Sequence, residues 1–236
     1  GSTFLEVNKK DTDNFEIGLP QFLQQKKIAK ILITVDNLID QTQNLIEKYT
    51  AVKQGMMADL FSRGIDLSGT ADTNKNYGQL RPSFAEAPEL YQETELGWVP
   101  KEWKINRFKD ITDILTCGVA ATPVYVEEGE GFTFLSARNI KNGRIDLSKL
   151  SYIPEWLHLQ LTKHNKPRAG DILYSRVGAG YGEAAVVEIN EEFSVYVSLT
   201  HIRMKSGLNQ YFYKYLLNTP QIKNKASIDV FQGGGV

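Results

Sequence analysis

A hydrophobic seven-residue pattern between residues 28 and 60 constrains this chain more than any other feature. Its ten positions advance by four and three residues in turn, and eight of them are apolar. No Gly or Pro interrupts residues 21–54, so a helix of some 40 residues, roughly 60 Å long, is predicted. We expect it to be a coiled-coil-type helix that pairs with another long helix, rather than the core helix of one compact domain. The expected assembly surface is Ile28, Leu32, Val35, Ile39, Ile46, Tyr49, Met56 and Leu60.

Composition adds limits on the rest of the chain. The 236 residues are 42% hydrophobic and 23% charged, as in ordinary globular domains. The single cysteine, Cys117, excludes a disulfide framework and a multi-cysteine metal site. No apolar run approaches the roughly 18 residues of a membrane span, and no signal peptide opens the sequence. We therefore expect a cytoplasmic protein with no membrane partner.

Charge is distributed unevenly along the sequence. The net charge is −1 overall, but residues 98–236 carry +3 and residues 1–97 carry −4. Eight basic and three acidic residues lie between positions 134 and 182. A local basic surface matters more for phosphate binding than the average charge does. If the chain binds DNA, we expect weak binding alone and tighter binding with partners that add positive surface.

After Gly97 the sequence changes to short strands and turns. Asn142-Gly143 predicts a β-hairpin turn, and residues 209–218 predict an aromatic-rich amphipathic helix that ends before Pro220. The predicted fold class is α+β, a mixed-strand globular domain with one long helix. Strands are expected at 111–116, 132–135, 144–147, 171–176, 184–189 and 198–204. The expected divisions are a closing segment (1–18), the long helix (19–64), an exposed linker (65–97) and the globular domain (98–236).

Three segments resemble type I restriction–modification specificity subunits. Residues 17–29, with the long helix after them, are similar to the helical spacer of that family. Residues 96–103 (LGWVPKEW) resemble the start of its target recognition domain, and residues 170–178 (GDILYSRVG) resemble the central strand and turn of that domain. The three segments occur in the order that the family has, so the resemblance covers nearly the whole chain.

The resemblance implies a function without catalysis. In that family two recognition domains each read half of a split DNA target, and two long antiparallel helices dock methyltransferase subunits. This chain holds about half of such a subunit. We therefore expect double-stranded DNA, a methyltransferase subunit and a second specificity half as partners, the last in a homodimer if the half is natural. No cofactor is expected here, since S-adenosylmethionine would bind the methyltransferase. Residues 1–17 are expected to pack on a recognition domain of this chain or of a partner.

Motifs for catalysis are weak or absent in the sequence. No Walker phosphate-binding loop occurs, and the glycine-rich residues 178–182 precede a predicted strand where a dinucleotide fold needs a helix. The histidines lack metal-ligand spacing, and a solvated or capping role is expected for His158 and His164. A cryptic nuclease site remains an alternative, as do a coiled-coil protein-interaction module and a fragment of a fused restriction enzyme. The nuclease alternative would use Glu155, Asp171, Glu183 and Glu188 with the histidines.

DNA contacts are expected from side chains on turns and strand ends. Reading bases needs paired donors and acceptors, as Arg offers to guanine and Asn to adenine. The candidates for base contact are Arg138, Asn139, Ser175, Arg176, Tyr181, His201 and Arg203. The candidates for phosphate contact, which position the DNA without reading it, are Lys141, Lys163, Lys166 and Arg168. No metal ligands are expected.

Overall fold

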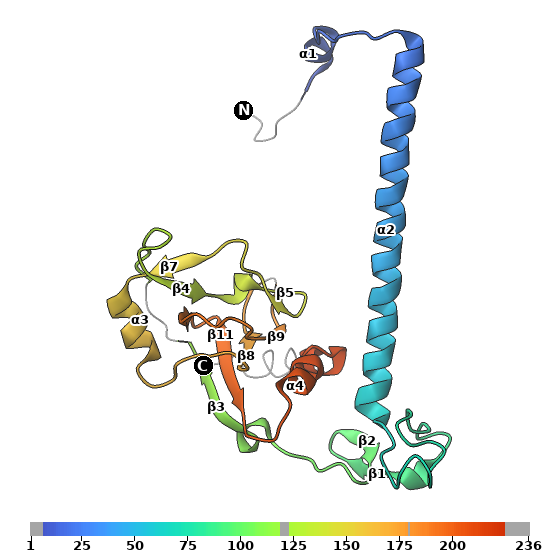
Figure 1. Ribbon diagram of the computed structural model, residues 1–236, viewed down its shortest axis with the longest axis vertical. Coiled ribbons are helices and arrows are strands. Elements are labelled where there is room, and N and C mark those ends of the chain that lie inside the picture. Colours follow the sequence, from blue (N-terminus) through green and yellow to red (C-terminus); the bar gives the residue numbers. More distant parts are fainter. Residues whose placement is uncertain (1–6, 119–122, 179, 225–236) are drawn as a thin grey trace. The chain divides into compact units, whose positions relative to one another are not determined.

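The computed structural model confirms the α+β class, with one long helix and several small sheets, of which the three-stranded sheet is mixed (Figure 1). The structure describes residues 7–118, 123–178 and 180–224. Two compact units, residues 1–53 and 54–236, divide the chain within the long helix. The helices are α1 (Lys9–Asp13), α2 (Phe22–Arg63), α3 (Glu155–Thr162) and α4 (Gln210–Leu217), with 3₁₀ turns η1 (Pro88–Leu90), η2 (Phe108–Asp110) and η3 (Ala137–Asn139).

Helix α2 is the 42-residue helix that the seven-residue pattern predicts. It begins two residues after Pro20 and ends at Arg63, before Gly64, whose φ of +68° suits a residue without a side chain. The predicted assembly surface is exposed in this chain, with Leu32 58% and Ile39 60% accessible. Despite its length, α2 is too polar to cross a bilayer, and no other helix in the described ranges could do so.

Residues 98–236 contain two small sheets that pack on one another in the core. A four-stranded sheet has the order β3-β11-β8-β9, and a three-stranded sheet has the order β10-β4-β7. Their shared core includes Leu135, Phe193, Leu173 and Leu199. Helix α4 covers the other face of the first sheet through Leu217, and α3 covers the second sheet in the same way. The strands of the first sheet are β3 (Thr112–Cys117), β8 (Ile172–Ser175), β9 (Ala184–Val186) and β11 (Leu199–Met204); those of the second are β4 (Phe132–Leu135), β7 (Ser151–Ile153) and β10 (Phe193–Val195).

The predicted hairpin at Asn142-Gly143 is present. It joins β5 (Ile140–Lys141) to β6 (Arg144–Ile145) in an antiparallel pair. Asn142 has φ +54° and Gly143 has φ +71°, and two positive φ angles are what a type I′ turn requires. The six predicted strands are all found, four of them shorter by one to three residues than expected, while α3, β7 and β10 were not predicted.

Residues 65–97, predicted as an exposed linker, contain a strand that was not predicted. This strand is β1 (Tyr91–Thr94), which pairs with β2 (Gly97–Pro100) in an antiparallel hairpin. Tyr91 is only 4% exposed, and its hydroxyl donates to the Pro82 carbonyl at 2.6 Å. The polar, turn-rich composition of this segment predicts an exposed linker. In the structure, hydrogen bonds between its turns and contacts between aromatic side chains give the segment an ordered fold.

Candidate nucleic-acid interface

Three loops meet where the strands of the two sheets end. Strands β4 and β10 are parallel, with Val195 opposite Leu135, so both point their carboxyl ends the same way. Three hydrogen bonds donated by backbone N–H groups hold the following loops together. Ala137 N–H donates to Ser198 Oγ and Arg176 N–H donates to the Ser198 carbonyl, both at 2.9 Å. Tyr196 N–H donates to the Leu135 carbonyl, also at 2.9 Å. We call this surface the loop edge, comprising residues 136–142, 175–178, 180–182 and 196–198.

Two predicted arginines are exposed on the loop edge. Arg138 lies in η3 and its guanidinium donates to Ser151 Oγ. Arg176 follows β8 and donates to the Val197 carbonyl at 3.4 Å, a long bond that leaves most of its donors free. Tyr181 is half-buried in the glycine-rich loop beside them. Guanidinium groups in this setting can present paired donors to a base edge or to a phosphate.

Two other predicted base contacts on the loop edge are structural. Asn139 is 2% exposed, and its amide oxygen accepts from Ser136 N–H at 3.0 Å while its amide nitrogen donates to the carbonyls of Asp146 and Lys149. Ser175 is fully buried and donates to the Val177 carbonyl at 3.3 Å. Because these polar groups are buried and engaged within the protein, we correct the prediction that they contact bases.

The remaining base candidates lie at the opposite end of β8, in a buried network around Asp171. His201 is 1% exposed, and its Nε2 lies 2.6 Å from Asp171 Oδ2. The Arg203 guanidinium donates to both carboxylate oxygens at 2.8 Å. Burial raises the pKa of Asp171, but hydrogen bonds from His201, Arg203 and Arg168 N–H outweigh it and hold that pKa below its usual value. The prediction that His201 and Arg203 read bases is therefore corrected: both side chains are hydrogen-bonded to a buried carboxylate.

The predicted phosphate contacts divide between the two ends. Lys141 belongs to the loop edge, where its ammonium lies 2.5 Å from Asp146 Oδ2. The other three accompany the Asp171 network: Arg203 donates to the Lys166 carbonyl at 2.9 Å, and Arg168 N–H donates to Asp171 at 2.9 Å. Lys163 follows α3, three residues before Lys166, and all three side chains are exposed. The structure thus places Arg138, Arg176, Tyr181 and Lys141 on the loop edge, and it places Lys163, Lys166 and Arg168 near the opposite end of β8.

His158 also departs from its predicted solvated or capping role. It is 1% exposed and stacks on Phe132 with ring centroids 3.9 Å apart. Its Nδ1 lies 2.9 Å from Ser194 Oγ, and its Nε2 lies 3.3 Å from Glu192 Oε2. Ser194 is 36 residues away in sequence, so no local pattern could have revealed this partner. His164 is exposed, as expected.

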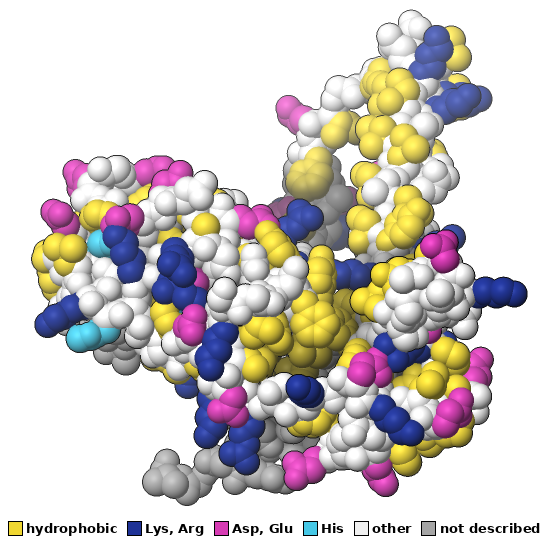
Figure 2. All heavy atoms as spheres, turned by 60° about the horizontal axis from the view of Figure 1, so that its bottom comes forward, with side chains coloured by type: hydrophobic (Ala, Val, Ile, Leu, Met, Phe, Trp, Pro, Cys, Tyr) yellow, Lys and Arg dark blue, Asp and Glu magenta, His cyan; other side chains and the backbone are white. Residues whose placement is uncertain are grey.

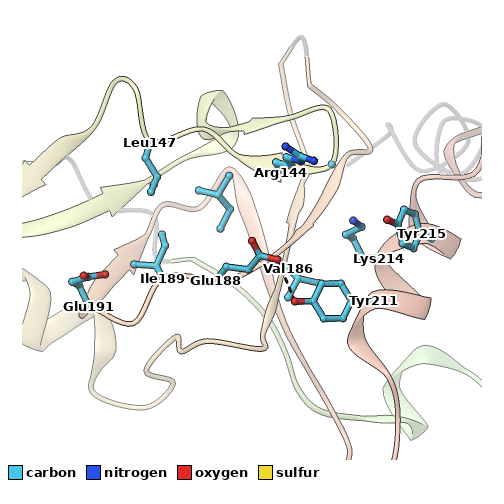
Figure 3. A pocket seen from close by; sticks show the side chains of 11 residues that line it. Arg144, Leu147, Val186, Glu188, Ile189, Glu191, Tyr211, Lys214 and Tyr215 are labelled. Carbon is cyan, nitrogen blue, oxygen red and sulfur yellow. Dashed lines mark hydrogen bonds between the residues drawn. The ribbon is translucent and has the colours of Figure 1, made fainter. Parts of the chain in front are cut away.

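A groove beside the β5–β6 hairpin adds basic and aromatic side chains that the sequence prediction left out. It has a volume of about 620 Å³ and lies between β6, the end of β9 and α4. Figure 3 shows Lys214 and Tyr215 at one end, Arg144 above the middle, and the apolar Leu147 and Ile189 at the other end. The Lys214 ammonium sits 3.9 Å from the centre of the Tyr215 ring.

The groove also contains acidic groups, so its charge is mixed. The Tyr211 hydroxyl donates to Glu188 at 3.2 Å (Figure 3), and this bond raises the pKa of Tyr211. Two sequence signals could have indicated this site. Arg144 directly follows the Asn142-Gly143 turn, and Lys214 lies between two tyrosines of α4. Figure 2 likewise shows basic side chains interspersed with acidic ones on the face it presents.

The carboxylates of the nuclease alternative do not converge. Asp171 is held by His201 and Arg203, and Glu188 is bonded to Tyr211. Among the residues with described positions, no three His, Cys, Asp or Glu side chains are grouped so that they could hold a metal ion.

Comparison with known proteins points to one family. The family model for the type I restriction modification DNA specificity domain matches residues 1–50. The MjaVIII type I restriction enzyme specificity subunit of Methanocaldococcus jannaschii is 26% identical over 232 residues, covering 96% of this chain and 49% of that subunit. The putative MjaX specificity subunit of the same organism is 27% identical over 140 residues, covering 58% of this chain and 32% of that subunit.

The chain is similar to type I restriction specificity subunits. It spans about half the length of the MjaVIII subunit. Among solved structures, the HsdS subunit from Thermoanaerobacter tengcongensis aligns with 95% of this chain and 48% of its own at 16% identity (TM-score 0.42). A second structure, from work on the structural basis underlying complex assembly and conformational transition of the type I R-M system, aligns with 94% of this chain and 48% of its own chain at 17% identity (TM-score 0.49).

The two sequence matches cover different parts of the chain. The family model ends at residue 50, so it covers α1 and most of α2. The MjaVIII alignment extends across nearly the whole chain and so includes the loop edge and the groove. Both relatives are named as specificity subunits.

Proposed function

We propose that this chain is the part of a type I restriction–modification specificity subunit that reads one half of a split DNA target. The observation that carries the proposal is the pair of exposed arginines, Arg138 and Arg176, on loops that one sheet edge holds together. Loops fixed by a sheet can enter a groove of DNA without moving the core. The module itself is non-catalytic, acts in the cytoplasm, and needs no cofactor of its own.

Base reading in this proposal belongs to Arg138 and Arg176, with Tyr181 beside them. Each guanidinium can donate two parallel hydrogen bonds to guanine O6 and N7 in the major groove. Lys141, Arg144 and Lys214 would bind phosphates and so fix the position of the loop edge on the duplex. Nearby carboxylates lower the net positive charge, in keeping with weak binding by the chain alone. Lys163, Lys166 and Arg168 would bind phosphates only where the duplex reaches the far end of β8.

Helix α2 would carry the assembly contacts. Hydrophobic side chains are exposed along its length, in one row with Ile28 and Ile39 and in a second row with Ile31 and Leu38; Figure 2 shows such side chains gathered along the helix. Two rows can contact two partners. We propose that these are a methyltransferase subunit, which holds S-adenosylmethionine, and the helix of a second specificity half, in a homodimer if the half is natural. Residues 1–17 would pack on a recognition domain in that assembly.

The experiment is to express the chain with its methyltransferase subunit and to map methylated adenines genome-wide. A homodimer of halves predicts a symmetric, interrupted motif, because two identical loop edges would read inverted half-sites. An asymmetric motif would indicate a longer subunit with a second, different recognition domain. Absence of any methylated motif, with both proteins folded and co-purifying, would contradict the DNA-reading role.

A protein-interaction module without DNA binding is the second candidate, and the exposed apolar rows of α2 favour it. The two functions differ in their response to salt. Binding to DNA through phosphates weakens steeply as salt rises, whereas association through the apolar rows changes little. Measuring the affinity of the purified chain for duplex DNA at several salt concentrations separates them.

A further inference from the structure

We infer that the residues around the carboxyl end of α2 form a rigid collar, in which Trp103 fixes the direction of the helix relative to the β1–β2 hairpin. The collar comprises residues 63–66 and 79–103. The collar overlaps the segment that the sequence predicts to be an exposed linker, residues 65–97. The inference rests on the proposed function only in its consequence, which is that the collar helps set the distance between two DNA half-sites.

Gly64 is the centre of the collar. It ends α2 by donating its N–H to the Leu60 carbonyl at 3.1 Å, with a φ of +68°. A Cβ placed on Gly64 would lie only 2.7 Å from Cζ2 of the Trp103 ring. The indole is therefore in direct contact with the backbone of the helix end, an approach that only glycine permits.

Two arginines tie the chain before and after Gly64 to the following turns. The Arg63 Nε donates to the Arg81 carbonyl at 2.7 Å, and Arg81 N–H donates to the Gly64 carbonyl at 3.2 Å. The Arg81 guanidinium donates to the Ile65 carbonyl at 3.1 Å and forms an ion pair with Glu102. The Arg81 side chain is only 13% exposed, whereas its partner Glu102 is 49% exposed, so these contacts are partly buried.

The hairpin is attached to the same contacts from its other side. Gln92 in β1 donates from its side-chain amide to the carbonyls of Lys101 and Trp103, both at 3.1 Å. Trp103 is thereby bonded through its backbone to the hairpin and packed through its ring on the helix end. The end of α2, the two arginines and the hairpin thus share several contacts, which would hold the last turn of α2 in one direction relative to the hairpin.

The consequence concerns spacing. Two recognition halves held by paired helices are separated by a fixed distance only if each helix leaves its own half in one direction. In the proposed function, loosening the collar leaves the reading of one half-site intact but relaxes the preferred gap between two half-sites. Trp103 is thus a positioning residue, which acts through the helix and does not touch DNA.

The test measures distances between spin labels on cysteines at Gln54 and Glu95, two exposed positions, in a Cys117→Ser background. Trp103→Ala and Gly64→Ala should broaden and shift the distance distribution, because each breaks the ring–backbone contact. Trp103→Phe keeps a ring against Gly64 and should retain most of the narrow distribution. Thermal melting followed by circular dichroism verifies that each variant is folded.

Two matched controls separate the contact from general damage. Gly78 has a φ of +78° and nothing within 4 Å of an added Cβ, so Gly78→Ala imposes similar backbone strain without meeting a tryptophan. Trp156 on α3 lies outside the collar and is 58% exposed, so Trp156→Ala removes an indole that is not at the helix end. Both controls should keep the narrow distribution. Folded Trp103→Ala protein with the wild-type distribution would overturn the collar.

A second measurement connects the collar to DNA. With the methyltransferase present, Trp103→Ala should methylate targets whose gap is one base pair longer or shorter than the preferred gap, while its affinity for a single half-site stays unchanged. An unaltered gap preference would overturn the consequence for spacing. If the wild-type chain supports no methylation at all, the proposed function fails, and the spin-label distances still decide whether the collar is rigid.

Discussion

Replacing Asp171 with asparagine tests the buried network that the structure places at the start of β8. The carboxylate is 2% exposed and accepts hydrogen bonds from Arg203 and Arg168 N–H, with His201 Nε2 at 2.6 Å. The substitution exchanges one carboxylate oxygen, an acceptor, for an amide nitrogen that donates and that would face other donors. It also removes the only anion that the structure pairs with Arg203 among the described residues.

The expected loss follows from the cost of breaking a buried ion pair, which is about 3–5 kcal/mol. Arg203 is 18% exposed in its side chain, so part of its charge can be solvated after the substitution. We therefore expect a loss near the lower bound, about 3 kcal/mol, in the free energy of unfolding. For a unit of the size of residues 54–236, that corresponds to a fall in Tm of about 6–12 °C.

The assay is urea unfolding at pH 7 with a matched control at Asp72. That carboxylate is exposed in a turn of the same unit, so Asp72→Asn removes the same charge from the surface and should leave the unfolding midpoint nearly unchanged. Asp171→Asn should lower the midpoint without changing the slope of the transition. A change in unfolding free energy below about 1 kcal/mol, the range of exposed ion pairs, would show that the network does not stabilise the fold as argued.

Acid should reveal the same network. The pKa of Asp171 in the folded protein is below its ordinary value because the bonds from His201 and Arg203 outweigh the effect of burial. Its contribution to stability is therefore complete above the unfolded pKa of about 3.9 and is lost as the pH falls through the folded pKa. Wild-type protein should lose stability below about pH 4 more steeply than Asp171→Asn. Parallel curves for the two proteins in acid denaturation would contradict this account.

Three further predictions concern binding. Arg176→Ala should cost about 1–3 kcal/mol on the proper DNA target and reduce discrimination between sequences; equal weakening on every DNA would make Arg176 a phosphate ligand. Lys214→Ala should weaken binding about equally on all sequences and reduce the salt slope by about 1, as measured by fluorescence anisotropy titrations. Leu32→Asp should abolish association of α2 with its partner, because it puts a charge in an apolar row, while Tm of the recognition part stays unchanged; sedimentation profiles identical to wild type would refute the assembly role of that row.

Local patterns predicted the parts of the fold that depend on local physics. Helix α2 follows from a repeat that needs no knowledge of distant residues, and the β5–β6 hairpin follows from the positive φ angles that Asn142 and Gly143 tolerate. The short strands β7 and β10 escaped prediction for the opposite reason. Strand β10 is three residues long and pairs with β4 some sixty residues earlier, so its existence depends on a contact that no sequence window contains.

The candidate site was predicted in its residue types more than in its placement. Arg138 and Lys141 follow β4 and Arg176 follows β8, and these two loops lie together because both are hydrogen-bonded to Ser198 in the loop after β10. Asn139 and His201 also have side-chain groups that could hydrogen-bond to bases. In the structure both are buried, and these groups contact a loop carbonyl and the Asp171 carboxylate instead. Which polar side chain is buried is decided by tertiary partners, and the sequence offers no local sign of them.

The separation of stabilising and reading groups has a consequence for how such a module can change its target. Asp171 directly precedes β8 and Ser175 is its last residue, so the two lie about 13 Å apart at the usual rise of a strand. The buried charges at Asp171 stabilise one end of the sheet, and the exposed arginines lie beyond the other end. Substitutions at Arg138 or Arg176 therefore leave the core clusters and the Asp171 network intact. New base preferences on the loop edge should accordingly have little cost in stability, whereas substitutions at Asn139 should reduce stability, because its amide holds together the loop that presents Arg138.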